Sequence, residues 1–132
     1  MKSFPAYALL SIASVSSAAC GTTEPLAVCP DSVTVSVSSG LSPVFDWAPR
    51  CGIHLMSVMQ EGIVADSVRV RWAITVTPPA LMTAPMQFGQ VPAGASVETA
   101  AKPLETGKDY GIRIYRLDPQ RVTLVGIKFF QP

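Results

Sequence analysis

The feature that most constrains the fold is a strict alternation of apolar and polar residues in DSVRVRWAITVT (66–77). Val70, Trp72 and Ile74 have one parity, whereas Arg69 and Arg71 have the other. Because successive side chains of a strand point to opposite faces, this pattern predicts a half-buried strand with its apolar set toward the core. Sustained helical periodicity does not occur after residue 19, so the sequence predicts an all-β fold.

Other short segments of the chain have the same character, with Gly- or Pro-containing turns between them. The segment 52–59 is apolar on both faces, which predicts a central strand, and the Pro-rich segment 78–85 suggests a crossing between sheets. Seven or eight antiparallel strands of this length predict a β-sandwich. Besides 66–77, the expected strands are 32–38, 43–49, 52–59, 86–91, 96–100, 109–117 and 121–130.

Residues 1–19 have the order of a secretory leader. Lys2 supplies a positive charge, residues 4–15 form an uncharged apolar run, and small residues follow at 16–19. That order is typical of a signal peptide. The apolar run is shorter than the roughly 20 residues that a membrane-spanning helix needs. We therefore expect residues 1–19 to direct export and to be removed.

Two cleavage routes are open at Cys20. The small residues Ser17 to Ala19 suit general signal peptidase, which would release a soluble periplasmic or secreted protein. Followed by Cys20, they resemble the bacterial lipobox, whose cysteine is diacylated and becomes the N-terminus, although Ser17 stands where Leu is usual. Two or three acyl chains hold a protein firmly at a membrane. We expect the lipoprotein, with residues 20–30 as a flexible tether, on a bacterial membrane (the outer membrane in a Gram-negative cell).

Charge and cysteine content narrow the function further. The chain has 132 residues with ten basic and nine acidic ones, a balance that gives no support to nucleic-acid binding. If Cys20 carries lipid, Cys29 and Cys51 remain as an even pair in an oxidising compartment; otherwise one thiol is left over. His54 is the single histidine, and CxxC spacing is absent, so a zinc site is disfavoured.

The segment LETGKDY (104–110) resembles the fibronectin type III signature before strand F, in which a Leu precedes a Tyr by six positions. Thr106 stands where Pro is usual, and Gly107 keeps its place. The resemblance implies a buried Tyr110 whose hydroxyl bonds upstream backbone, the tyrosine corner. Trp47, in DWAP, resembles the strand B Trp of these domains. Over about residues 31–132 the resemblance implies a fibronectin type III- or Ig-like sandwich. We expect the core to contain Trp47, Trp72, Leu104, Tyr110, Ile112 and Ile114.

The chain departs from that family in its cysteines and in lacking a Tyr within 52–59. Cys29 just precedes the segment that resembles strand A, and Cys51 just follows the one that resembles strand B. In an antiparallel A–B pair, the start of A lies near the end of B. We therefore expect a Cys29–Cys51 disulfide, which contributes about 3 kcal/mol for a loop of about 20 residues.

In fibronectin-like topology, the strands C′, C, F and G form one sheet. The resemblance implies that the outward face of this sheet carries Arg69, Arg71, Arg113 and Tyr115. Arg and Tyr are enriched in protein interfaces, and the guanidinium group suits carboxylates or phosphates. This set is a candidate binding patch. The alternative is a solvated sheet face whose charges oppose edge pairing.

The sequence offers no catalytic constellation. His54 stands in an apolar strand, where we expect a packed or sheet-surface side chain, and GxSxG, P-loop, dinucleotide and HExxH motifs do not occur. We therefore expect no enzyme, no cofactor, no metal and no nucleic-acid partner. The expected function is a non-catalytic envelope binding or adhesion module for a protein or glycan. A structural accessory subunit of an envelope assembly and a secreted soluble binding domain are the alternatives.

Overall fold

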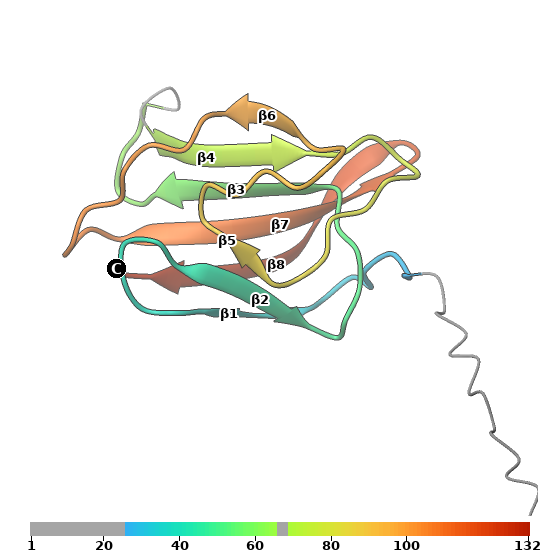
Figure 1. The fold of residues 1–132 in the computed structure, drawn as a ribbon, viewed down its shortest axis with the longest axis horizontal. Coiled ribbons are helices and arrows are strands. Elements are labelled where there is room, and N and C mark those ends of the chain that lie inside the picture. The colour runs from blue at the N-terminus through green and yellow to red at the C-terminus, as the bar shows by residue number, and fades with distance from the viewer. Residues whose placement is uncertain (1–25, 66–68) are drawn as a thin grey trace, which may run out of the picture.

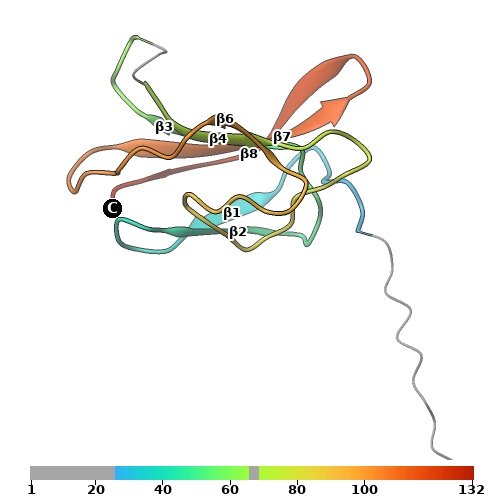
Figure 2. The same cartoon turned by 45° about the horizontal axis from the view of Figure 1, so that its top comes forward.

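The computed structural model of the chain describes residues 26–65 and 69–132. The predicted leader and the predicted lipid attachment at Cys20 lie outside these residues. In the described part, two antiparallel sheets face each other across one apolar layer (Figures 1 and 2). The predicted all-β, two-sheet sandwich is thus confirmed.

The smaller sheet has the strand order β1-β2-β5, and the larger has the order β6-β4-β3-β7-β8. The apolar segment expected to be central forms β3, in the middle of the larger sheet. The Pro-rich segment after β4 leads the chain across to the smaller sheet. The bounds are β1 (Thr34–Val37), β2 (Val44–Ala48), β3 (Leu55–Gln60), β4 (Val70–Thr75), β5 (Met86–Gln87), β6 (Ser96–Thr99), β7 (Tyr110–Asp118) and β8 (Arg121–Phe130).

The core lies between the two sheets because alternate residues of each strand point inward. Phe45 of β2 and Trp72 of β4 meet across the layer, with ring centroids 6.5 Å apart. Phe130 at the end of β8 packs edge-on against Phe45 at 5.7 Å. Such aromatic pairs contribute about 0.5–1.5 kcal/mol beyond the area they bury. All six residues predicted for the core are buried: Trp47, Trp72, Leu104, Tyr110, Ile112 and Ile114.

The turn before β7 has the predicted geometry. Tyr110 is fully buried, and its hydroxyl accepts a hydrogen bond from the backbone N–H of Glu105 at 2.8 Å. Gly107 has a φ of +81°, a conformation that residues with a Cβ seldom adopt. Leu104 packs into the core just before this turn. The hydroxyl–backbone bond predicted for Tyr110 is therefore confirmed.

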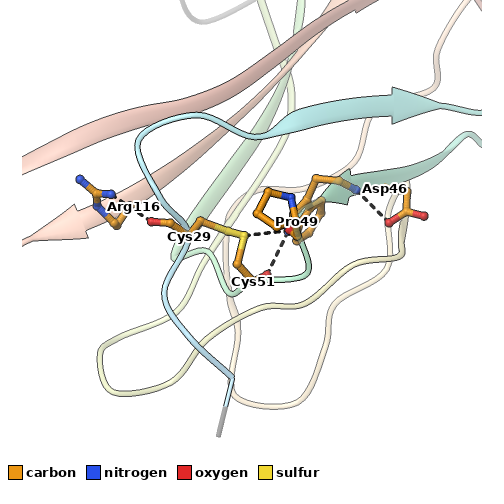
Figure 3. Close-up of a disulfide and its surroundings, with 6 residues drawn as sticks. Cys29, Asp46, Pro49, Cys51 and Arg116 are labelled. Carbon is orange, nitrogen blue, oxygen red and sulfur yellow. Dashed lines mark hydrogen bonds between the residues drawn. A yellow bond between two sulfur atoms is a disulfide. The ribbon is translucent and has the colours of Figure 1, made fainter. Parts of the chain in front are cut away.

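The predicted disulfide joins Cys29 to Cys51, with Cα atoms 4.8 Å apart (Figure 3). Both cysteines are buried, and their carbonyl oxygens are hydrogen-bonded. The indole N–H of Trp47 donates to the Cys51 oxygen at 3.0 Å, and Arg116 of β7 donates to the Cys29 oxygen at 2.9 Å. The covalent bond and these two hydrogen bonds hold the N-terminal segment against both sheets.

One boundary and one strand register differ from the sequence expectation. The last part of the predicted 20–30 tether runs along Gly52: Cys29 donates to the Gly52 oxygen at 2.9 Å, and the Gly52 N–H donates to Ala27 at 2.8 Å. In β4, a register shift places Val70 opposite Met59 although Trp72 is opposite Val58. This β-bulge interrupts the alternation predicted across 66–77, so Val70 is partly exposed rather than part of the core.

Candidate interaction face

The outward face of the five-stranded sheet is defined by its register. Ser57 lies opposite Ala73 on one side and Arg113 on the other, and Arg113 lies opposite Ile127. Directly opposed residues share a face. Because the neighbouring positions Met56, Val58, Ile112 and Ile114 are all in the core, this row faces away from the smaller sheet.

A carboxylate that follows β3 joins two of the predicted arginines. Glu61 Oε1 lies 2.9 Å from Arg113 Nη1, and Glu61 Oε2 lies 3.4 Å from Arg69 Nη2. The three side chains are 14–29% exposed, which leaves them less screened than fully solvated pairs. Two guanidinium groups around one carboxylate leave this cluster with a net positive charge.

Gly111 makes room for this ion pair on the sheet surface. A Cβ at Gly111 would lie 2.8 Å from Glu61 Oε1, 3.0 Å from Arg113 Nη1 and 3.2 Å from the Phe129 ring. Without a side chain at that position, the Arg113 guanidinium lies over the sheet with its Cζ 5.8 Å from the Phe129 centroid. That distance is within the range of a cation–π contact.

The outward positions of β8 are apolar and exposed. Ile127 and Phe129 lie opposite Arg113 and Gly111, and Leu124 lies opposite Tyr115. Single exposed apolar residues are ordinary on protein surfaces, but a contiguous apolar run with a polar rim is typical of a contact site. We call these four residues the β8 stripe: Val122, Leu124, Ile127 and Phe129, which are 53%, 46%, 39% and 58% exposed.

The predicted patch is only partly assembled. Arg69 and Arg113 meet at Glu61, and Tyr115 is on the outward face in the row next to Arg113, opposite Leu124. Arg71 is not part of this group, because the bulge in β4 directs its Nε to the side-chain oxygen of Gln60 at 3.2 Å.

Sequence reasoning missed Glu61 and the β8 stripe. For the β8 stripe the sequence did contain a signal: apolar residues occupy both alternate sets of positions in 121–130, whereas a strand with one buried face needs them in only one set. Glu61 gave no such signal, since a carboxylate in a turn after a strand is ordinarily solvated.

A concave region, separate from this sheet face, lies at the end of the sandwich where the N-terminal segment enters. This end pocket has a volume of 770 Å³, and its wall carries the polar side chains of His54, Arg116 and Asp118. The rest of its lining consists of Leu26, Val28, Cys29, Pro30, Pro78, Pro79, Leu81 and Leu117.

Hydrogen bonds tie the charged groups of the end pocket together. Arg116 donates from Nε to Asp118 at 2.8 Å and from Nη2 to Asp31 at 2.8 Å, and the Thr123 hydroxyl donates to Asp118 at 2.6 Å. The bonds from Arg116 and Thr123 lower the pKa of Asp118, and the bonds to Asp118 and Asp31 raise the pKa of Arg116. Arg116 and Asp118 are therefore held as ions at neutral pH.

His54 is buried beside this cluster, as expected for a packed histidine. Burial is the main cause that lowers its pKa; Arg116 lowers it further, and Asp118 opposes the change. The imidazole is therefore neutral at pH 7.

Over residues 26–65 and 69–132, no three His, Cys, Asp or Glu side chains are grouped closely enough to hold a metal ion. Within the same ranges, a helix of the length and apolarity needed to cross a membrane is also not found. Comparisons with models of protein families, with curated proteins and with solved structures found no match for this chain.

Proposed function

We propose that this chain is a non-catalytic binding module of the bacterial cell envelope, a fibronectin type III-like sandwich held at a membrane through lipid on Cys20. Its contact surface is the β8 stripe together with Arg113 and Tyr115. The partner is an envelope protein or glycan.

Strand order supports the fibronectin type III-like assignment. β4, β3, β7 and β8 lie side by side in one sheet, as strands C′, C, F and G would, and β1, β2 and β5 form the other. The hydrogen bond between Tyr110 and Glu105 has the form of the tyrosine corner. β6 is an additional strand beside β4, which accounts for the longer connection before β7.

The single observation that carries the binding role is the β8 stripe beside the Arg113–Phe129 contact. Interface cores are enriched in aromatic residues and Arg, and a few such residues supply most of the binding energy. Phe129 is 58% exposed and already lies against the Arg113 guanidinium, so little side-chain entropy remains to be lost when a partner covers both.

The chemistry of the described residues supports a non-catalytic role. The single histidine of the chain, His54, is buried and its Nδ1 accepts the backbone N–H of Leu117 at 3.0 Å. A general base needs a free lone pair within reach of a substrate. Cys29 and Cys51 are bonded to each other, so neither supplies a thiolate nucleophile.

Membrane attachment is proposed from the sequence, and the position of the first described residue suits it. Leu26 is six residues beyond Cys20, a distance of at most about 20 Å in a fully extended chain. A lipid on Cys20 would therefore keep the end of the domain that contains Leu26 close to the bilayer.

Two measurements test the two parts of this proposal. For the anchor, the intact mass of the protein expressed in a bacterial host should equal the mass of a chain that begins at Cys20 plus the mass of its acyl groups. An unacylated chain would overturn the anchor.

For the contact surface, we expect the double variant Ile127→Ser with Phe129→Ser to abolish co-purification of the partner from cross-linked envelopes. The control Val97→Ser, at an apolar residue of β6 that is 48% exposed, should leave it unchanged. Equal recovery of the partner with the double variant and with the Val97→Ser control would contradict the assignment of the β8 stripe as the contact surface.

A further inference from the structure

His54, the residue before β3, is hydrogen-bonded through its backbone and its ring to β7 and to the residue that follows β4. Its N–H donates to the Tyr115 oxygen at 3.0 Å, and its carbonyl oxygen accepts from the Val76 N–H at 2.8 Å. Its Nδ1 accepts from the Leu117 N–H at 3.0 Å. The ring thus holds β7 at the position where the β7–β8 hairpin extends beyond the sandwich (Figure 2).

The bond to Leu117 requires one protonation state. A ring nitrogen that accepts a hydrogen bond carries a lone pair, so the proton of the neutral imidazole is on Nε2. Adding a second proton places an N–H on Nδ1, directly opposite the N–H of Leu117. The hydrogen bond is then lost, and two donors face each other.

The charges around His54 come from the elements packed against it. Asp118 and Arg116 of β7 act on the ring in opposite directions, and Asp31 of the N-terminal segment is bound to Arg116. Arg121 of β8 lies 3.9 Å from Asp118 and compensates part of its charge. β4 and the loop after it contribute uncharged residues, Thr75, Val76 and Pro78 to Leu81. A proton on His54 is therefore not fully compensated by its neighbours.

We propose that His54 is a proton-operated latch. In the neutral form it holds the backbone of Leu117, and with it the hairpin from Leu117 to Val122, against the rest of the sandwich. Protonation releases this hairpin. Since Leu117 forms part of the wall of the end pocket, release also changes the shape of that pocket. The latch depends neither on the anchor nor on the partner proposed above.

The test is amide hydrogen exchange followed by NMR on the disulfide-bonded chain from residue 20 onward. After correction for intrinsic exchange, we expect protection of the Leu117 amide to fall at least tenfold between pH 7.5 and pH 5. The amides of Ile112 and Ile114, in the middle of β7, should keep their protection. In His54→Asn the side-chain oxygen can accept from Leu117 but does not titrate, so protection should not depend on pH. Constant protection in the wild type, or an equal loss in His54→Asn, would overturn the latch.

A second measurement keeps the test valid if His54→Asn does not fold. The chain has one histidine, so the imidazole ¹⁵N shifts of the wild type can be assigned directly. We expect the Nε2–H tautomer at pH 7.5 and a change in the Leu117 amide shift that follows the ring titration. An Nδ1–H tautomer, or a Leu117 amide that is unaffected by the titration, would contradict the proposal.

Discussion

The two edge strands of the five-stranded sheet present different surfaces to solvent. β6 has four residues, three of them polar, including Glu98. β8 has ten residues and carries the four exposed apolar side chains of the β8 stripe. Proteins commonly protect sheet edges with short strands and charges. β6 follows this rule. On β8, the apolar surface is retained, which is expected where a partner covers it.

The N-terminal segment covers part of the β8 edge. The Val33 N–H donates to the Val125 oxygen at 2.8 Å, beside the bulge where Ile114 lies opposite Gly126 and Tyr115 opposite Leu124. Arg116 and the disulfide hold the same segment. Val33 therefore pairs with β8 at the bulge, while the stripe residues on both sides of it remain 39–58% exposed.

The largest effect that we expect on this arrangement comes from the disulfide. Cys29→Ala with Cys51→Ala should lower the free energy of unfolding by about 3 kcal/mol, because the unfolded chain regains the entropy of an open loop. The segment that contains Val33 should also exchange faster in the double variant. Urea unfolding of the wild type and variant measures the change. A loss below about 1 kcal/mol would mean that Arg116 and the strand pairing hold this segment without the covalent bond.

The next largest effect on stability compares a core-facing glycine of β8 with an outward-facing glycine of β7. A Cβ at Gly126 would lie 2.8 Å from side-chain atoms of both Val33 and Val35 and 3.0 Å from Ile114, all of them in the core. Gly126→Ala should therefore cost about 1–3 kcal/mol through overpacking. Gly111→Ala meets the movable ends of Glu61 and Arg113 and should cost less. An equal cost for both would contradict the packing described for the two faces, and urea unfolding measures it.

A smaller effect on stability is expected when the pH is lowered. The pKa of His54 is lowered in the fold, so the unfolded chain binds more protons at mildly acidic pH, and stability is lost as the pH falls below about 6.5. The pKa of Asp118 is also lowered, and its contribution is lost only at more acidic pH, as the pH falls below about 4. In His54→Asn the first decline should disappear and the second should remain. Unfolding midpoints from pH 8 to pH 3 measure both, and an unchanged first decline in the variant would exclude His54 as its cause.

The smallest effect on stability is expected from a substitution in the proposed contact surface. Phe129→Ser removes an exposed side chain, so the free energy of unfolding should change by no more than about 0.5 kcal/mol, as for most surface substitutions. Thermal and urea unfolding check this value. A larger loss would mean that Phe129 is needed for folding, and its exposure would then lose its value as an argument for binding.

Features set by local pattern were predictable from the sequence, and those set by register were not. Leu104 and Tyr110 were placed correctly because the spacing in 104–110 resembles the fibronectin type III turn, and Trp47 was placed correctly because it alternates with polar residues in its strand and resembles the strand B Trp. The bulge that separates Arg71 from Arg113 depends on how β4 meets β3, which sequence alternation does not encode. The exposure of Phe129 depends on β8 being an edge, and a strand that is apolar in both parities otherwise indicates a buried one.

The most direct test of the account is site-specific photo-cross-linking in living cells, with the photoreactive side chain at position 129 on β8 or at position 97 on β6. Both positions are about half exposed, at 58% and 48%, and lie at opposite edges of one sheet. We predict a discrete adduct from position 129 that disappears when Arg113 is changed to Glu, and none from position 97. The same adducts from both positions, or none from position 129 in a folded and exported protein, would contradict the assignment of the β8 stripe as the contact surface.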